Sequence, residues 1–361
     1  MSADSRSQLG AVDLDDVAGL LNADRDGLLR AASMAGAQMR ATATALDEGV
    51  LDSLKSDYPP RTVIWVATRG TAEVAGSLLA AALGGSMAAP FVVASEVPPW
   101  IGALDVLIVA GDDPADPTLV AAAASGTRRG ARVVIAAPEE GPLREVAAAR
   151  AAVLSPRVAV PADFGLTRYL AAGLATLRVV DPGMQVDLAA LADDLDAEAL
   201  RNSAGRESFT NPAKTLADRM SGCEVVLAGD NAATLTLARH CAAVMLRVGL
   251  QSTAAAGLSD VLVAVQGGMA RRTTDYETAL FHDEELDGPL PTRVRTIVLT
   301  IGDERPALAA RLSGFDDIDV ISAEDVPDVA TPTPGGRPEQ QLALLAVRLE
   351  MTAVYLRLVR G

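Results

Sequence analysis

Aromatic residues, cysteines and lysines are all scarce in this chain of 361 amino acids. Phe, Trp and Tyr together make up 3% of the residues, so the core has to be built from Ala, Val and Leu on closely approaching helices. Cys223 and Cys241 are the two cysteines, and both lie in segments that we expect to be buried. We therefore expect no disulfide framework and a reducing compartment.

Positive charge is also in deficit. Lys and Arg number 31 against 47 Asp and Glu, which gives a formal net charge of -16, and lysine occurs only at Lys55 and Lys214. Nucleic acids and anionic membranes bind basic surfaces, so we expect neither as a partner. A phosphorylated ligand would need a locally basic pocket on this acidic protein.

An export signal and a membrane span are missing from the pattern as well. Residues 1–10 have no basic end followed by an apolar stretch. Residues 74–95 are uncharged, but they are rich in Ala and Gly and contain Pro90, so they favour a helix, a turn and a buried strand over a span. We expect a cytoplasmic protein.

What the sequence does contain is a pattern of short apolar runs between helix-length stretches. Residues 11–58 are helical in pattern and end at Pro59 and Pro60. Apolar runs then predict strands at the following positions: 62–67, 90–94, 104–110 and 132–137. Such runs alternating with helices, here including one at 166–177, are typical of a parallel sheet covered on both faces.

The second half repeats this pattern. The strand, small polar turn and Ala-rich helix of 63–80 return at 225–248, and a repeat of this size indicates two fused copies of one α/β unit. After a connection at 183–210 that is helical near 188–200, Asn211 and Pro212 predict a helix start. We expect four strands and a final helix in this half: 224–228, 261–265, 293–300, 317–322 and 339–359.

The pattern predicts an α/β protein with two three-layer α/β/α domains built on parallel sheets, against which the N-terminal and C-terminal helices pack. We divide the chain into a helical segment at 1–60, a first domain at 61–195, and a second domain at 196–361 that includes the last helix.

The first strand-turn-helix corner carries the clearest candidate binding residues, Thr68, Arg69, Gly70 and Thr71. A helix N-terminus after such a turn offers free backbone N–H groups and the positive end of the helix dipole, which suit an anion. The alternative is that Thr71 only caps its helix. In the second corner, Asp230 stands where an anion would lie, and we expect its carboxylate to cap that helix and repel phosphate.

Three carboxylates follow the third strand, in the run Gly111-Asp112-Asp113-Pro114-Ala115-Asp116. At the carboxyl edge of a parallel sheet they could bind a divalent cation or sugar hydroxyls. The competing interpretation, which we favour, is a surface turn rich in Asp and Pro.

The two histidines have different surroundings. His240 lies within an apolar helix, where we expect a buried histidine with a hydrogen-bond partner rather than a metal ligand. His282 lies in an acidic segment that would raise its pKa and keep it partly protonated near neutral pH. It could donate a proton to a sugar ring oxygen, or it could belong to a solvated charged loop.

Several landmarks, in order, resemble the double sugar-isomerase (SIS) domain family, in particular its bifunctional phosphoglucose/phosphomannose isomerases. Residues 66–74 resemble the glycine-rich first turn of the family. Pro156-Arg157 resembles the Pro-Arg whose arginine faces the substrate, and 211–214 (Asn-Pro-Ala-Lys) resembles the opening of the second domain. His282-Asp283-Glu284 resembles a His-Asn-Glu motif whose histidine assists ring opening.

The resemblance implies a homodimer that isomerises glucose 6-phosphate or mannose 6-phosphate to fructose 6-phosphate through an enediol, with no cofactor and no metal. It implies that Arg157 and His282 face the substrate. If the activity is retained, Glu284 takes the role of the base, and Arg69 and Arg157 hold the phosphate.

The sequence departs from the family at two points. The acidic run 111–116 replaces a Ser/Thr-rich loop that holds phosphate, and carboxylates repel a phosphate dianion. The glutamate base of the family should lie near 251–254, where there is none. We therefore predict a protein that binds a sugar or sugar phosphate in a binding or regulatory role and whose isomerase activity is lost or altered. The alternative is an active aldose-ketose isomerase.

Overall fold

The computed structural model describes residues 12–148, 150–269, 293–315, 318–325 and 336–360, and it contains two parallel β-sheets. The first sheet has the strand order β2-β1-β3-β4-β5 and consists of β1 (Val63–Val66), β2 (Phe91–Ala94), β3 (Val106–Ala110), β4 (Arg132–Ala136) and β5 (Ala152–Val153). The second has the order β7-β6-β8-β9 and consists of β6 (Glu224–Gly229), β7 (Thr253–Gly257), β8 (Val294–Leu299) and β9 (Ile318–Ile321). In both sheets the strand before the corner helix lies second in the order, so the predicted repeat is confirmed.

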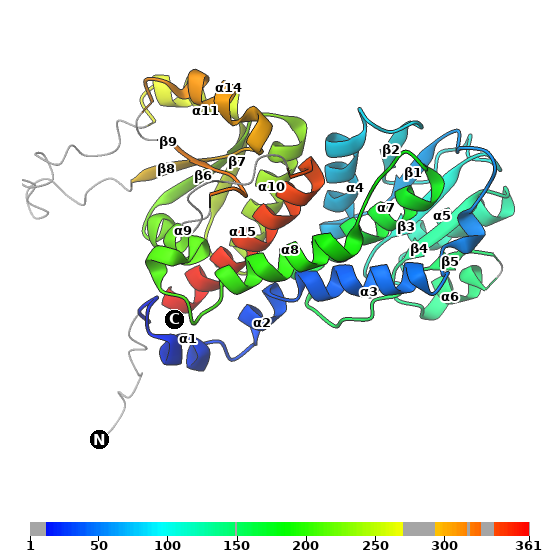
Figure 1. Ribbon diagram of the computed structural model, residues 1–361, viewed down its shortest axis with the longest axis horizontal. Coiled ribbons are helices and arrows are strands. Elements are labelled where there is room, and N and C mark those ends of the chain that lie inside the picture. The colour runs from blue at the N-terminus through cyan, green and yellow to red at the C-terminus, as the bar shows by residue number, and fades with distance from the viewer. Residues whose placement is uncertain (1–11, 149, 270–292, 316–317, 326–335, 361) are drawn as a thin grey trace, which may run out of the picture.

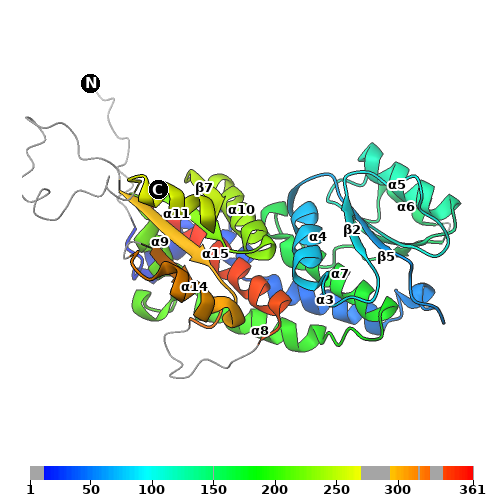
Figure 2. The same ribbon diagram turned by 90° about the horizontal axis from the view of Figure 1, so that it is seen from above.

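Helices cover both faces of each sheet (Figures 1 and 2). Those that follow strands of the first sheet are α4 (Gly70–Leu83), α5 (Pro117–Arg128), α6 (Gly141–Ala147) and α7 (Leu166–Val180). Those of the second half are α8 (Leu188–Arg201), α9 (Pro212–Met220), α10 (Ala232–Arg247), α11 (Leu258–Gln266) and α14 (Arg305–Leu312). The N-terminal helices are α1 (Val17–Ala23), α2 (Leu28–Ala32) and α3 (Ala35–Asp47), and the last helix is α15 (Pro338–Arg360). The predicted α/β class is confirmed, and the division into domains stays a prediction.

Alternation along β1 shows why the first sheet needs helices on both faces. Ile64 and Val66 pack into a cluster with α5 and α6, whereas Val63 and Trp65 point to the opposite face, towards α4 and α7. All four side chains are at most 1% exposed. A strand that is buried on both faces reads as a continuous apolar run, which is why this run predicted its strand well.

One hydrophobic cluster continues from the first half of the chain into the second. It contains Trp65 and Leu174 of the first half together with Leu227, Leu237 and Tyr355 of the second half. Helix α10 packs against α4, and α15 packs against α4, α8, α9 and α10 (Figure 1). The two sheets are therefore joined by a shared helical core.

The strand predicted at 261–265 is wrong, because these residues belong to α11. The strand is β7, at Thr253–Gly257, which runs parallel to β6 with Val225 beside Thr253 and Gly229 beside Gly257. Ala and Gly have low β-propensity, so the pairing with β6 overrides local preference here. The short strand β5, which pairs with β4 at one edge of the first sheet, was not predicted.

Candidate functional site

The turn between β1 and α4 has the geometry of an anion-binding corner. Gly70 has φ +70, in the left-handed region that glycine adopts without strain, and a Cβ there would meet no described atom within 4 Å. Arg69 is the N-cap of α4, and among the described residues no side chain accepts a hydrogen bond from the first backbone N–H groups of this helix. These donors are available to a bound acceptor.

The two threonines of the corner point to different partners. Thr68 Oγ1 donates to Asp116 Oδ2 at 2.8 Å, and Thr71 Oγ1 donates to the carbonyl oxygen of Ala162 at 3.3 Å. Thr71 is 2% exposed and is not the cap of α4. The capping alternative is therefore wrong, and both hydroxyls tie the corner to neighbouring loops.

The acidic run after β3 folds back over this corner as a paired, hydrogen-bonded turn. Asp116 caps α5 by accepting from the N–H of Thr118, and Asp113 lies 3.4 Å from Arg69 Nη2. Burial alone would raise the pKa of Asp116, but the hydrogen bonds from Thr68, Thr118 and Leu119, together with the charge of Arg69, outweigh it and hold the pKa below its ordinary value. Two of the three carboxylates thus engage residues of the corner or cap a helix.

The third carboxylate, Asp112, joins a buried aromatic residue. It accepts a hydrogen bond from Tyr169 Oη at 2.8 Å and pairs with Arg168, whose guanidinium lies 4.5 Å from the centre of the Tyr169 ring. Burial of Tyr169 raises the pKa of its phenol. Arg168 and Tyr169 thus hold Asp112 at the edge of the sheet by an ion pair and a hydrogen bond.

A cavity of about 340 Å³ opens between the corner and the acidic run. Its lining includes all four predicted corner residues, Thr68 to Thr71, together with Asp112, Asp113 and Asp116. The predicted site residues of the first corner are therefore brought together at the carboxyl edge of the first sheet, where ligands bind in open α/β sheets.

Two charged residues of this cavity, Asp163 and Arg247, were not predicted from the sequence. Asp163 lies in a short 3₁₀ turn, η2 (Ala162–Phe164), and Arg247 is the last residue of α10. Arg247 Nε donates to Asp163 Oδ1 at 2.5 Å. Because 84 positions separate the two residues, no local pattern in the sequence could connect them.

Arg157 lies at a different cavity. Its Nη1 donates to Glu48 Oε1 at 3.0 Å, and the guanidinium lowers the pKa of the Glu48 carboxyl. This second cavity is small, about 20 Å³, and it also contacts Arg168. The structure therefore does not place Arg157 with Arg69 in one cavity, and Arg168 lies between the two sites.

The predicted catalytic residues His282 and Glu284 lie outside the described residues. His240 is 2% exposed, and its Nε2 lies 3.1 Å from Glu350 Oε1, which confirms a buried histidine with a partner. In the described part of the chain, no group of three or more His, Cys, Asp or Glu side chains could hold a metal ion.

The second corner differs from its prediction. Asp230 does not cap α10. The cap is Asn231, whose side chain accepts from the N–H of Thr234 in a capping box, and Asp230 instead pairs with Arg311 of α14. Asn accepts this bond as well as Asp does, so the shift by one residue costs the helix nothing. The N-terminus of α10 is thereby closed by its own side chain, unlike that of α4.

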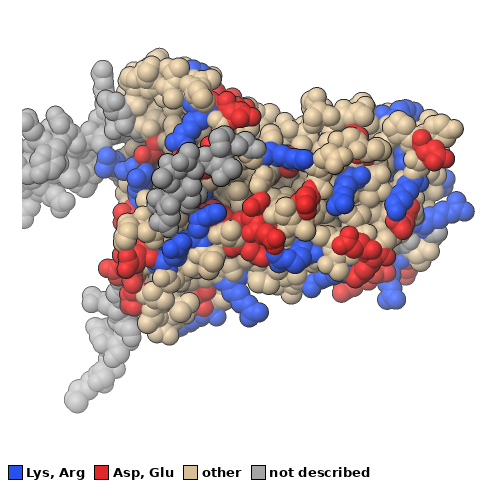
Figure 3. All heavy atoms as spheres, in the orientation of Figure 1, with Lys and Arg blue, Asp and Glu red and all other residues tan. Residues whose placement is uncertain are grey.

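Charged side chains of both signs are interspersed over one face of the protein, where Figure 3 shows no continuous basic area among the described residues. No helix in the described ranges is both long enough and apolar enough to cross a bilayer.

Similar folds occur among solved structures. A protein assigned as a phosphosugar isomerase from Bacillus subtilis is 17% identical, with 89% of this chain and 95% of that chain covered at a TM-score of 0.60. Tagatose-6-phosphate ketose/aldose isomerase from Escherichia coli is 16% identical, with 95% and 93% covered at a TM-score of 0.61. The C-terminal domain of glucosamine-fructose-6-phosphate aminotransferase from Francisella tularensis is 10% identical, with 95% and 96% covered at a TM-score of 0.56.

No protein-family model matches the sequence, and no curated protein is detectably similar to it. At identities of 10–17%, the likeness to solved structures carries the fold and not the activity. The two parallel sheets, their strand orders and these neighbours together show that the chain has the two-unit α/β fold of the sugar-isomerase (SIS) type.

Proposed function

We propose that this chain binds a sugar or sugar phosphate at the first corner, and that the isomerisation of the resembling family is lost or altered in favour of a binding or regulatory role. The observation that carries the proposal is the cavity of about 340 Å³ in front of the uncapped N-terminus of α4. Its volume falls within the range of small-molecule pockets, about 300–1,000 Å³. The fold neighbours named for sugar phosphates make this ligand class the natural one to test.

The lining of the cavity supports a ligand with hydroxyl groups. Asp112, Asp113 and Asp116 present carboxylate oxygens, which accept hydrogen bonds from sugar hydroxyls. The free N–H groups of α4 and the guanidinium of Arg69 suit an anionic group of the ligand. A sugar phosphate carries both kinds of group, and a free sugar carries the first.

Loss of isomerisation is supported by the segment where the resemblance places the base. Gln251 is 3% exposed, and its Nε2 donates to the carbonyl oxygens of Met220 and Cys223. This side chain bonds to two backbone carbonyl groups and carries no carboxylate, so it cannot move a proton between adjacent carbons.

We also propose that the protein forms a homodimer, as the resemblance implies.

Thermal unfolding with free hexoses, hexose 6-phosphates and nucleotide sugars tests the proposal. A ligand at 100 times its Kd stabilises the folded state by about 2.7 kcal/mol, which raises Tm by several degrees. Ala162→Trp should abolish the shift, because Ala162 is exposed and lines the cavity. The matched control is Ala148→Trp, a change at an exposed alanine at the end of α6. No shift with any of these compounds would refute the binding role.

Turnover decides between the two functions. Purified protein should not convert glucose 6-phosphate or mannose 6-phosphate to fructose 6-phosphate. Conversion that disappears in Glu284→Gln would establish the isomerase alternative instead.

A further inference from the structure

One side chain of the candidate cavity comes from the second half of the chain. Helix α10 begins at the corner that follows β6 in the second sheet, and it packs against α4 (Figures 1 and 2). Its last residue, Arg247, lines the cavity in front of the N-terminus of α4 together with Arg69. The cavity is therefore completed by the helix of the other unit.

Arg247 is held by an ion pair that a ligand can replace. Its Nε donates to Asp163 Oδ1 at 2.5 Å, which leaves Nη1 and Nη2 outside that contact. The side chains of Arg247 and Asp163 are 46% and 33% exposed, so water screens their attraction and the pair contributes little. A guanidinium binds a phosphate in a bidentate manner, which is stronger than its bond to one carboxylate oxygen.

Arg69, the other cation of the cavity, is less well placed for this role. Its side chain is 74% exposed and lies 3.4 Å from Asp113. Arg157 lines a separate cavity of about 20 Å³, which is too small for a phosphate group. Arg69 and Arg247 are the arginines of the described chain that line the candidate cavity, and the side chain of Arg247 is the less exposed of the two.

We propose that Arg247 is the specificity-determining residue for a phosphate group on the sugar, and that Asp163 is its internal competitor. The inference rests on the proposed function. In the free protein Asp163 neutralises Arg247, and in the complex the phosphate of the ligand takes the place of Asp163 on the guanidinium. Binding then replaces the ion pair between η2 and α10 by a contact between the ligand and α10. A helix of the second unit therefore contacts the ligand directly only when the sugar carries a phosphate.

A purely structural role for Arg247 makes different predictions. A cation at the C-terminus of a helix is favourable in itself, and the ion pair could serve only to fasten η2 to α10. Removing either partner would then weaken folding without discriminating between ligands. Under the proposal, the two partners have opposite effects on the affinity for a phosphorylated sugar.

Calorimetric titration of the full chain with glucose 6-phosphate, mannose 6-phosphate and the two parent sugars separates these readings. Arg247→Ala should weaken binding of the phosphorylated sugars by about tenfold or more and leave the parent sugars unchanged. Asp163→Asn should tighten binding of the phosphorylated sugars, because it frees Arg247 and removes a carboxylate that faces them. Arg239→Ala, at an exposed arginine of the same helix, is the matched control and should change neither affinity.

Arg247→Lys keeps the charge and should retain part of the preference, because an ammonium cannot make the bidentate contact. The proposal is overturned, and the binding role survives, if the wild-type protein binds parent and phosphorylated sugars equally well or if Arg247→Ala binds both as the wild type does. Weaker phosphate binding by Asp163→Asn also overturns it. If the wild-type protein binds none of the four sugars or the nucleotide sugars, both the inference and the proposed function fall.

Discussion

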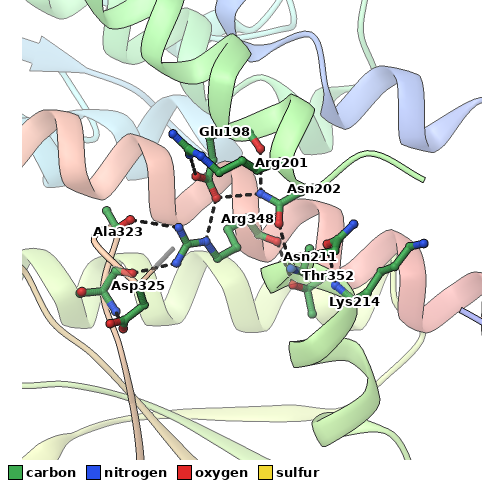
Figure 4. A network of polar contacts seen from close by, with 11 residues as sticks. Glu198, Arg201, Asn202, Asn211, Lys214, Ala323, Asp325, Arg348 and Thr352 are labelled. Carbon is green, nitrogen blue, oxygen red and sulfur yellow. Dashed lines mark hydrogen bonds and ion pairs between the residues drawn. The ribbon is translucent and has the colours of Figure 1, made fainter. Parts of the chain in front are cut away.

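Arg348 of α15 and Glu198 of α8 form an ion pair of 2.7 Å across 150 positions of sequence, with side chains only 1% and 0% exposed. Glu198 also accepts from Arg201 and from Asn202, while Arg348 donates to the carbonyl oxygens of Ser322 and Ala323 (Figure 4). Each charge is thus surrounded by hydrogen-bonding partners. A buried carboxylate is tolerated only when it is satisfied in this way.

Arg348→Met should therefore lower the free energy of unfolding by about 3–5 kcal/mol, because it removes the buried counter-charge of Glu198 and leaves only the partly exposed Arg201 paired with this buried carboxylate. Arg357→Met on the same helix is the matched control. Its guanidinium pairs with Asp26 at the surface, where an ion pair contributes at most about 1 kcal/mol. Urea unfolding measures both, and equal losses would contradict the assigned burial.

Gly76→Ala should destabilise the protein by about 1–3 kcal/mol. The indole of Trp65 lies directly against Gly76 of α4, where a Cβ would overlap its ring, and the Trp65 Nε1 donates to the carbonyl oxygen of Ala72 at 2.9 Å. Gly85→Ala is the control, since a Cβ there would meet no described atom within 4 Å. Thermal unfolding should show a fall in Tm for the first variant and little change for the second.

The two lysines should react at very different rates with an amine-directed reagent. Lys214 is 0% exposed, and its Nζ donates to the carbonyl oxygens of Ala204 and Arg206, whereas Lys55 lies at the surface beside Asp52. Mass spectrometry should find Lys55 modified in the folded protein and Lys214 modified only after unfolding. Rapid labelling of Lys214 in the native state would show that its burial is misassigned.

Glu350→Gln should make stability less dependent on pH. Burial raises the pKa of Glu350 above its ordinary value of 4.5, although the hydrogen bond with His240 opposes this. Between 4.5 and the raised pKa, the folded state keeps a proton that the unfolded state has released, so this residue lowers stability as the pH rises through that window.

The variant cannot titrate at this position, so its stability relative to wild type should increase from about pH 4.5 upwards. Urea unfolding at a series of pH values gives this difference directly. Glu207→Gln, a change at an exposed glutamate, should leave the pH profile of the wild type unaltered.

Local signals in the sequence predicted several elements of the fold correctly. Asn211 accepts from the N–H of Lys214 and Pro212 occupies the first turn of α9, as their residue types indicate. The apolar run 106–110 forms a strand with every residue buried. These features depend on neighbours in sequence, and their physical causes can be read from a few residues.

Features that depend on pairing over long distances could not be predicted. The Ala-rich segment 253–257 becomes a strand only because β6 offers it an edge, while the Val-containing stretch 261–265 turns into a helix that covers the sheet. The same holds for the candidate site. The corner 68–71 was predicted from its turn and helix start, but the contact between Asp163 and Arg247 exists only once α10 has packed beside α4.

Helix α15 has a consequence for how the chain is made. It packs against α2, α4, α8, α9 and α10, all of which leave the ribosome before it, and most of its side chains are buried in the finished protein. Until it emerges, the apolar surfaces that it covers in both halves stay exposed, so neither half can complete its core before α15 has been made. We expect the nascent protein to depend on chaperone protection until then.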